Sequence, residues 1–249
     1  MKKQNYSKED LLTRWEIRRE VQNIMGKYSQ SYCIKQEGAL GQFWSRRDDI
    51  CLGLNNGWYV GQEAVLGYYA AIDAETALAS RLIAARFPEK LAGKTEEELF
   101  GVGQISYRPI DTQVVEVADD LQSAKGLWVV RGLVEWVTTA GPVSFWDFSY
   151  WAVDFILEDG AWKILHMLDL HEIDKRQGLG LTDAEPALPE DPAFAEMASV
   201  TYPAPTVPCV LRETYRADRA FTPSPRLPEP YRTLDETFSY GMEGGAWNG

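Results

Sequence analysis

Apolar and aromatic positions recur at helical spacing near the N-terminus of the chain. Five of them follow one another at intervals of three or four residues: Ile17, Val21, Ile24, Tyr28 and Tyr32. This spacing places them on one face of a helix. Ser7, with Asp10 three residues later, forms a capping pattern at the helix start, and Gly38 predicts its end. A short helix to about Arg47 follows.

The next segment changes between strand and helix patterns. Residues 50–60 predict two short strands around Asn55-Asn56-Gly57, because Asn-Gly favours the positive φ of a hairpin turn. An alanine-rich run from Gly61 to Phe87 predicts a long helix, which Pro88 stops. Thr95 caps a further short helix.

From Gln104 onward, the hydrophobic period becomes two. The pattern predicts strands at 105–118, 124–137, 143–157 and 161–171, with Asp119-Asp120, Gly141-Pro142 and Asp159-Gly160 as turns. Helices followed by a run of hairpin strands are typical of an α+β fold and do not fit a doubly wound parallel sheet.

Composition changes sharply near residue 175. Ten of the thirteen prolines lie after it, so residues 176–249 can form neither the interior of a sheet nor a long helix. This stretch nevertheless keeps many aromatic and aliphatic residues, which disordered segments lack. We therefore expect one domain over 1–175, and an extended arm over 176–249 that packs on its own domain or on a partner subunit.

Charge and targeting signals narrow the expected partners. The formal net charge is −12 and the basic residues are dispersed, which disfavours nucleic acid and anionic membranes as partners. The N-terminus has no apolar signal region, and no run of about 18 apolar residues occurs. Three widely spaced cysteines suggest no disulfide framework. These features predict a soluble cytoplasmic protein with reduced thiols.

Three segments carry a resemblance to a known family. They are Tyr28-Ser-Gln-Ser-Tyr32 followed by Phe43-Trp44 and Asp48-Asp49, then Trp58-Tyr-Val-Gly-Gln-Glu-Ala-Val, then Phe155-Ile-Leu-Glu-Asp-Gly-Ala-Trp-Lys-Ile-Leu-His166. In order and spacing they resemble the SnoaL-like family of the nuclear-transport-factor-2-like (NTF2-like) superfamily, over residues 7–171. The Pro-rich arm resembles the C-terminal extension of longer members.

The resemblance implies a cone-shaped α+β fold. Its N-terminal helices would pack on a strongly curved, mostly antiparallel sheet with a pocket in the concave face. It also implies homodimers that pair through the outer face of the sheet. Members include ketosteroid isomerase, scytalone dehydratase, polyketide cyclases and non-catalytic binding domains, so the fold alone does not fix the function.

The last hairpin predicts which side chains enter the pocket. A two-residue Asp159-Gly160 turn sets Leu157 against Trp162, Phe155 against Ile164, and Val153 against His166. One face then carries Trp151, Val153, Phe155, Leu157, Trp162, Ile164, His166 and Leu168, and the other carries Tyr150, Asp154, Lys163 and Asp169. A slip by one residue would invert this assignment.

His166 is the one polar group on that apolar face, which is typical of a small-molecule site, although a satisfied core histidine would fit as well. Tyr32 matches the carbonyl-binding tyrosine of scytalone dehydratase-like proteins, whereas Cys33 stands where they carry an acid, and Leu54 falls near the base of ketosteroid isomerase-like proteins. We therefore expect His166 and Tyr32 to be catalytic, with Asp49 as a second candidate base. His171 is expected to be exposed near the strand end.

Aromatic residues complete the expected pocket. The candidate substrate-binding residues are Tyr28, Trp44, Trp58, Tyr59, Trp151, Phe155 and Trp162, each of which could equally serve as core packing. The sequence has no P-loop, no dinucleotide fingerprint, no zinc motif and no nucleophile elbow, so no cofactor and no metal are expected.

The functional prediction keeps three readings open. The first is a cofactor-independent lyase (dehydratase) or isomerase that acts on a hydrophobic, oxygenated ring compound through a Tyr/His pocket. The second is a non-catalytic protein that binds a small hydrophobic ligand on the same scaffold. The third is a structural or assembly protein whose pocket is filled by side chains or by the arm.

Overall fold

A computed structural model describes residues 6–34, 37–138, 141–181, 183, 200–220 and 225–243. Its helices are α1 (Lys8–Ile34), α2 (Gln62–Ala84), α3 (Pro88–Leu91) and α4 (Glu96–Leu99), with short 3-10 turns η1 (Gly41–Phe43) and η2 (Leu234–Glu236). Its strands are β1 (Cys51–Leu54), β2 (Gly57–Val60), β3 (Gln104–Tyr107), β4 (Ile110–Val117), β5 (Ser123–Thr138), β6 (Gly141–Glu158), β7 (Ala161–Arg176) and β8 (Val207–Pro208).

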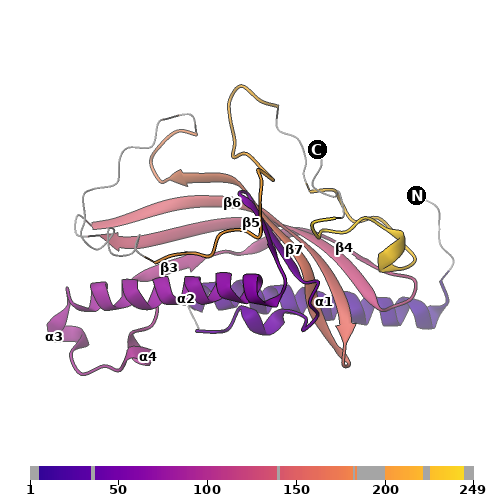
Figure 1. Ribbon diagram of the computed structural model, residues 1–249, viewed down its shortest axis with the longest axis horizontal. Coiled ribbons are helices and arrows are strands. Elements are labelled where there is room, and N and C mark those ends of the chain that lie inside the picture. The colour runs from indigo at the N-terminus through magenta and orange to yellow at the C-terminus, as the bar shows by residue number, and fades with distance from the viewer. Residues whose placement is uncertain are drawn as a thin grey trace.

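The strands form one twisted sheet in the order β3-β5-β6-β7-β1-β2-β8, and β4 also pairs with β5. Neighbouring strands are antiparallel except for β1 and β7, which run parallel. Helices α1 and α2 lie along one face of this sheet, and residues 225–243 lie on the other side (Figure 1). This is the α+β arrangement, with a mostly antiparallel sheet, that the resemblance predicted.

Local signals place the helix ends. At the start of α1, the backbone N–H and hydroxyl of Ser7 donate to the Asp10 carboxylate, and the Asp10 N–H donates to Ser7 Oγ. Thr95 and Glu98 form the same reciprocal capping box before α4. Both patterns satisfy backbone N–H groups that have no partner within the helix.

The single strand predicted over 105–118 is wrong. It is broken at Arg108 and Pro109 into β3 and β4, which both pair with β5. Pro109 has no N–H to donate to the ladder, so pairing cannot run through it. The break has a structural consequence, because it leaves the Arg108 side chain inside the domain.

Two apolar clusters lie on opposite faces of the sheet. The inner cluster, between the sheet and the helices, contains Tyr28, Tyr32, Trp151, Val153 and Phe155 among its members. The outer cluster lies between the sheet and the arm, and contains Cys51, Trp58, Leu127, Ala152, Leu168, Leu170, Leu211 and Tyr240. We call the two sides of the sheet the inner face and the outer face.

The predicted register of the β6–β7 hairpin is confirmed at its tip and wrong beyond it. Asp159 and Gly160 form the turn with positive φ, Leu157 pairs with Trp162, and Phe155 pairs with Ile164. A β-bulge between Asp154 and Phe155 then shifts the pairing, so that Asp154 faces His166. The extra residue in β7 moves the side chains that follow it to the opposite face, as far as a second bulge between His171 and Ile173.

The bulge corrects three assignments. Val153 pairs with Met167 instead of His166, and both His166 and Leu168 lie on the outer face. Asp169, which the sequence placed outside, enters the inner face, where it is buried.

The described parts of residues 200–243 contact the sheet of the same chain. Strand β8 pairs with β2, and the N–H groups of Cys209 and Leu211 donate to carbonyls of the β1–β2 turn. A side chain at Gly57 would place its Cβ 2.5 Å from the carbonyl oxygen of Val207, so glycine at the hairpin turn permits this close approach. Homodimer formation stays a prediction. In the described part of the chain, no helix is both long enough and apolar enough to span a membrane.

Candidate active site

A cluster of five polar side chains lies on the inner face of the sheet: Tyr32, Arg108, Asp147, Asp169 and His171. Four separate elements supply them. Tyr32 comes from α1, Arg108 from the break between β3 and β4, Asp147 from β6, and Asp169 and His171 from β7. We call this set the inner-face cluster.

His171 lies between two carboxylates. Its Nδ1 is 3.0 Å from Asp147 Oδ1, and its Nε2 is 3.5 Å from Asp169 Oδ1. The other oxygen of Asp147 forms an ion pair of 2.7 Å with Arg108. Asp147 thus makes the closer charged contact with the ring, at Nδ1, and Asp169 makes the longer one, at Nε2.

Charge balance sets the protonation of this cluster. Burial works against a charged His171, but Asp169 and Asp147 outweigh it, and the pKa of His171 is raised. For Asp169, burial is the larger effect, and it raises the pKa although His171 and Arg108 act to lower it. The pKa of Asp147 is lowered, since Arg108 and His171 outweigh burial. Both shifts favour the protonated forms of Asp169 and His171, whose side chains lie 3.5 Å apart.

Tyr32 adds a hydrogen-bond donor to the cluster. Its ring centroid lies 5.2 Å from the Arg108 guanidinium carbon, and burial, with a further contribution from Asp169, raises its pKa to about 12. The phenol consequently keeps its proton at neutral pH. A protonated phenol in a buried site can donate to a carbonyl oxygen or to a developing oxyanion.

Aromatic rings pack closely around Tyr32. Tyr28 contacts Tyr32 and Trp151 with ring centroids 5.4 and 5.2 Å away, and its hydroxyl lies 2.7 Å from the Tyr69 hydroxyl. Tyr28, Tyr69 and Trp151 are nearly inaccessible to solvent. These rings fill the deep end of the inner face, so a ligand must approach His171 from elsewhere.

A pocket of about 490 Å³ opens beside His171. Its walls are formed by Leu54, Asn55, Asn56, Tyr59, Tyr68, His171, Asp174, Tyr202 and Thr214. Tyr202 belongs to the arm. Its ring packs on Tyr68 with centroids 5.6 Å apart, and its hydroxyl donates to Glu75. The arm therefore supplies part of the wall through which a ligand would reach the cluster.

One buried hydroxyl beside His171 is unsatisfied. Ser149 is paired with His171 across β6 and β7, and its Oγ has no hydrogen-bond partner within the described residues. A buried polar atom without a partner costs roughly 1–3 kcal/mol, which a bound water or a polar ligand atom would recover.

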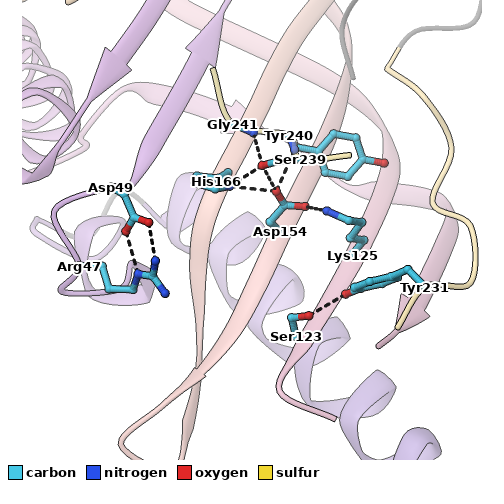
Figure 2. A network of polar contacts seen from close by, with 10 residues as sticks. All are labelled: Arg47, Asp49, Ser123, Lys125, Asp154, His166, Tyr231, Ser239, Tyr240 and Gly241. Atoms are coloured by element: carbon cyan, nitrogen blue, oxygen red, sulfur yellow. Dashed lines mark hydrogen bonds and ion pairs between the residues drawn. The ribbon is translucent and has the colours of Figure 1, made fainter. Parts of the chain in front are cut away.

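A second polar network lies on the outer face (Figure 2). Asp154 pairs with His166 at 2.9 Å and with Lys125 at 2.6 Å, and both Lys125 and Asp154 are completely buried. The Ser239 hydroxyl and the Tyr240 backbone N–H, both from the arm, donate to Asp154 Oδ2, the oxygen that also contacts His166. His166 is therefore on the opposite side of the sheet from Tyr32, which corrects the expectation that the two residues share a pocket.

The structure brings together most of the other predicted site residues. Six of the seven candidate substrate-binding residues belong to the inner cluster: Tyr28, Trp44, Tyr59, Trp151, Phe155 and Trp162. Trp58 is an exception, because it packs in the outer cluster beneath the arm. Asp49 is also outside the inner face, since it forms a half-exposed ion pair with Arg47.

Sequence reasoning missed four members of the inner-face cluster. Asp147 follows the same period of two along β6 as Trp151, so alternation alone places it on the inner face, whereas Asp169 and His171 reach that face only through the shift of one residue in β7. His171 was expected to be exposed, but it is mostly buried. No sequence signal brings Arg108 into this cluster, because its position depends on the break before β4. Within the described residues, no group of three His, Cys, Asp or Glu side chains could hold a metal ion.

These features define an α+β protein with a pocket and a cluster of ionisable side chains on the inner face of its sheet. No protein-family model matches the chain, and no curated protein matches it either. Solved structures give fold-level likenesses. A hexachlorocyclohexane dehydrochlorinase, LinA type 3 from Novosphingobium barchaimii LL02, is 16% identical, with 72% of this chain and 100% of that chain covered and a TM-score of 0.46.

Two further structures are similar to the same degree. A scytalone dehydratase candidate from Novosphingobium aromaticivorans DSM 12444 is 12% identical over 70% of this chain and 95% of its own, with a TM-score of 0.45. A protein from Kribbella flavida is 13% identical over 64% of this chain and 92% of its own, with a TM-score of 0.46. At such low identities and scores these likenesses say nothing about the reaction, which has to be argued from this chain's own residues.

Proposed function

We propose that the protein is a cofactor-independent lyase or isomerase that moves a proton on a small, oxygenated ring compound bound at the inner-face cluster. The observation that carries this proposal is the position of His171, held between Asp147 and Asp169 at the edge of a pocket. Imidazole and carboxylate groups that share a proton in a buried site are suited to general acid–base chemistry.

Each member of the cluster has a role in this proposal. Asp147, held by Arg108, orients the imidazole of His171 through Nδ1. Asp169 and His171 act together as the base that removes a proton next to a carbonyl and as the acid that returns it elsewhere. Tyr32 donates its hydroxyl hydrogen to the carbonyl oxygen, where negative charge develops as the proton leaves.

The pocket supports a ring compound as the substrate. Its volume of about 490 Å³ is within the range of small-molecule sites, and the phenol rings of Tyr59, Tyr68 and Tyr202 form much of its wall. Flat aromatic walls favour a flat ligand, and the phenol hydroxyls and asparagines favour one that carries oxygen atoms.

Deuterium exchange next to a carbonyl tests the proposal. Cyclohexanone and 1-tetralone are incubated with the protein in D2O, and loss of the α-proton signal is followed by NMR. We expect exchange above the buffer rate with wild type, and a loss on the order of 100-fold with His171→Gln. Ketones that bind, as measured by calorimetry, but never exchange would contradict the catalytic role.

A non-catalytic binding protein is the second candidate function. It is favoured by the close packing of Tyr28, Tyr69 and Trp151. These rings leave a ligand only the pocket beside His171. It is also favoured by Cys33, which stands where the resemblance leads one to expect an acid. This candidate predicts saturable binding of the same ketones without exchange, and affinity that depends on Tyr68 more than on His171.

A further inference from the structure

We propose that the outer face of the sheet carries a second ligand site, which binds a small organic amine with an apolar body through Nε2 of His166. The site lies between strands β1, β2 and β7 and the end of the arm. We call residues 234–243 of the arm the strap. This inference concerns a different pocket from the proposed catalytic site and does not depend on it.

The pocket has a volume of about 580 Å³. The strap and the sheet build it together. An apolar part of the wall is formed by Cys51, Val60, Leu165, Leu234 and Met242. Because much of the lining comes from the strap, the pocket exists only while the strap is docked on the sheet.

His166 presents one particular nitrogen to this pocket. Its Nδ1 lies 2.9 Å from Asp154 Oδ2 and 2.8 Å from Ser239 Oγ. The Ser239 hydroxyl donates its one hydrogen to Asp154 and accepts a hydrogen bond from the N–H of Gly241. It therefore has no hydrogen left to donate to Nδ1 of His166. Nδ1 must therefore carry the hydrogen and donate it, which makes Nε2 the acceptor in the neutral ring.

Nε2 is on the edge of the ring away from Asp154. Figure 2 shows His166 between Asp154 on one side and the Arg47–Asp49 pair on the other. No hydrogen bond to Nε2 is made within the described ranges of the chain. An acceptor nitrogen on a pocket wall calls for a ligand that brings a donor.

The strap holds the imidazole in this orientation. A Cβ at Gly241 would lie 3.0 to 3.1 Å from three atoms of the His166 ring, so the backbone of Gly241 packs directly on the ring face. The ring is thus clamped by Gly241 and anchored through Nδ1. Such a preorganised acceptor loses little entropy when a ligand binds.

The rim of the pocket is acidic. Asp49, Asp235 and Glu243 contribute three carboxylates, whereas Arg47 is the one arginine or lysine among the described lining residues, and Asp49 already neutralises it with two hydrogen bonds. The excess of negative charge favours a cation and disfavours a carboxylate or phosphate. A protonated amine meets both requirements, because its N–H groups can donate to Nε2 while its charge faces the rim.

NMR of the two histidines can test this site. The chain contains only His166 and His171, so either His166→Gln or His171→Gln assigns both imidazole Cε1–H signals. The probes are benzylamine, benzyl alcohol and benzoate, which share a body and differ in charge. We expect benzylamine to shift the His166 signal saturably at millimolar concentration and to leave His171 unmoved.

The charge series supplies the controls. Benzyl alcohol should bind more weakly than benzylamine, and benzoate should leave the His166 signal unchanged. The double variant Asp235→Asn, Glu243→Gln should weaken benzylamine binding by about tenfold, since it removes two partly solvated carboxylates. A His166 signal that benzylamine does not move, or that benzoate moves equally, would overturn the proposal. Neither result bears on ketone exchange at His171.

Discussion

His171 and Asp147 meet on the inner face of strands β7 and β6, with Nδ1 of the imidazole 3.0 Å from Oδ1 of the carboxylate. The same two strands carry a second imidazole–carboxylate contact, His166 with Asp154, on their outer face. The bulge opposite Asp154 and Phe155 produces both contacts, because it moves His166 outward and brings Asp169 and His171 inward. The two pairs have different surroundings, and the following predictions separate their roles.

Replacing Tyr32 by Phe should slow proton exchange without unfolding the protein. The substitution removes one donor and keeps the ring that packs on Trp151. We expect the exchange rate to fall on the order of 100-fold, as for the loss of one oxyanion donor. Tyr69→Phe is the matched control, since it removes a nearby phenol that contacts Tyr28 instead of the charged cluster. Equal rates in the two variants would refute the role of Tyr32.

The contribution of His171 to stability should depend on pH. Its folded-state pKa is raised, so this contribution is complete below the unfolded value of about 6.5 and is lost as the pH rises through the folded pKa. His171→Gln should therefore destabilise the protein more at pH 6 than at pH 9. Urea denaturation at both pH values measures the difference. A penalty that grows with pH would mean that the ring is neutral in the folded protein.

Asp154→Asn should be among the most destabilising single substitutions. It would leave Lys125 completely buried without its counter-charge, which costs about 3–5 kcal/mol. The aromatic rings of Phe238, Tyr240 and Tyr231, which surround the Lys125 ammonium at 5.0 to 5.5 Å, compensate only in part. Asp218→Asn, at the exposed pair with Arg216, is the control and should leave urea unfolding nearly unchanged.

Asp154 should also make stability sensitive to acid. Lys125 and His166 outweigh burial and hold the pKa of Asp154 well below its usual range. Its contribution is therefore present above the unfolded value of about 3.9 and is lost as the pH falls toward the folded pKa. The gap in stability between wild type and Asp154→Asn should be widest near neutral pH and shrink in acid. A gap that is constant down to pH 3 would argue against this linkage.

Gly241→Ala should loosen the strap. The added Cβ would approach three ring atoms of His166 at 3.0 to 3.1 Å, so either the strap or the ring must move. Crowding of this kind typically costs about 1–3 kcal/mol. Gly67→Ala in α2 is the control, because a Cβ there meets nothing within 4 Å and alanine favours the helix. If the two variants unfold at the same urea concentration, the strap does not pack on His166 as described.

Much of the fold could be predicted from the sequence, since its signals are local. Capping at Ser7 and Thr95, the Asn-Gly turn before β2 and the Asp159-Gly160 turn each fix a short segment of backbone. The alternation of hydrophobic and polar residues after Gln104 then predicts the four-strand meander and the α+β class. The break at Pro109 does not follow from alternation, because strand-like sequence continues on both sides of the proline.

The site was harder to predict, because it depends on register. One bulged residue near Leu165 decides whether His166 or His171 faces Tyr32, and no residue in that stretch marks the bulge. The arm posed a different difficulty. Its aromatic residues predicted that it packs on a surface, but only the three-dimensional arrangement shows that Tyr240 covers Lys125 and that Tyr202 borders the inner pocket.

The most direct test of the central claim compares the two histidines in a single assay. Deuterium exchange into 1-tetralone is measured for wild type, His171→Gln and His166→Gln, at equal concentrations of protein whose folding has been checked by circular dichroism. The account predicts that His171→Gln loses exchange on the order of 100-fold and that His166→Gln stays near the wild-type rate. Loss of exchange in His166→Gln, with full activity in His171→Gln, would contradict it.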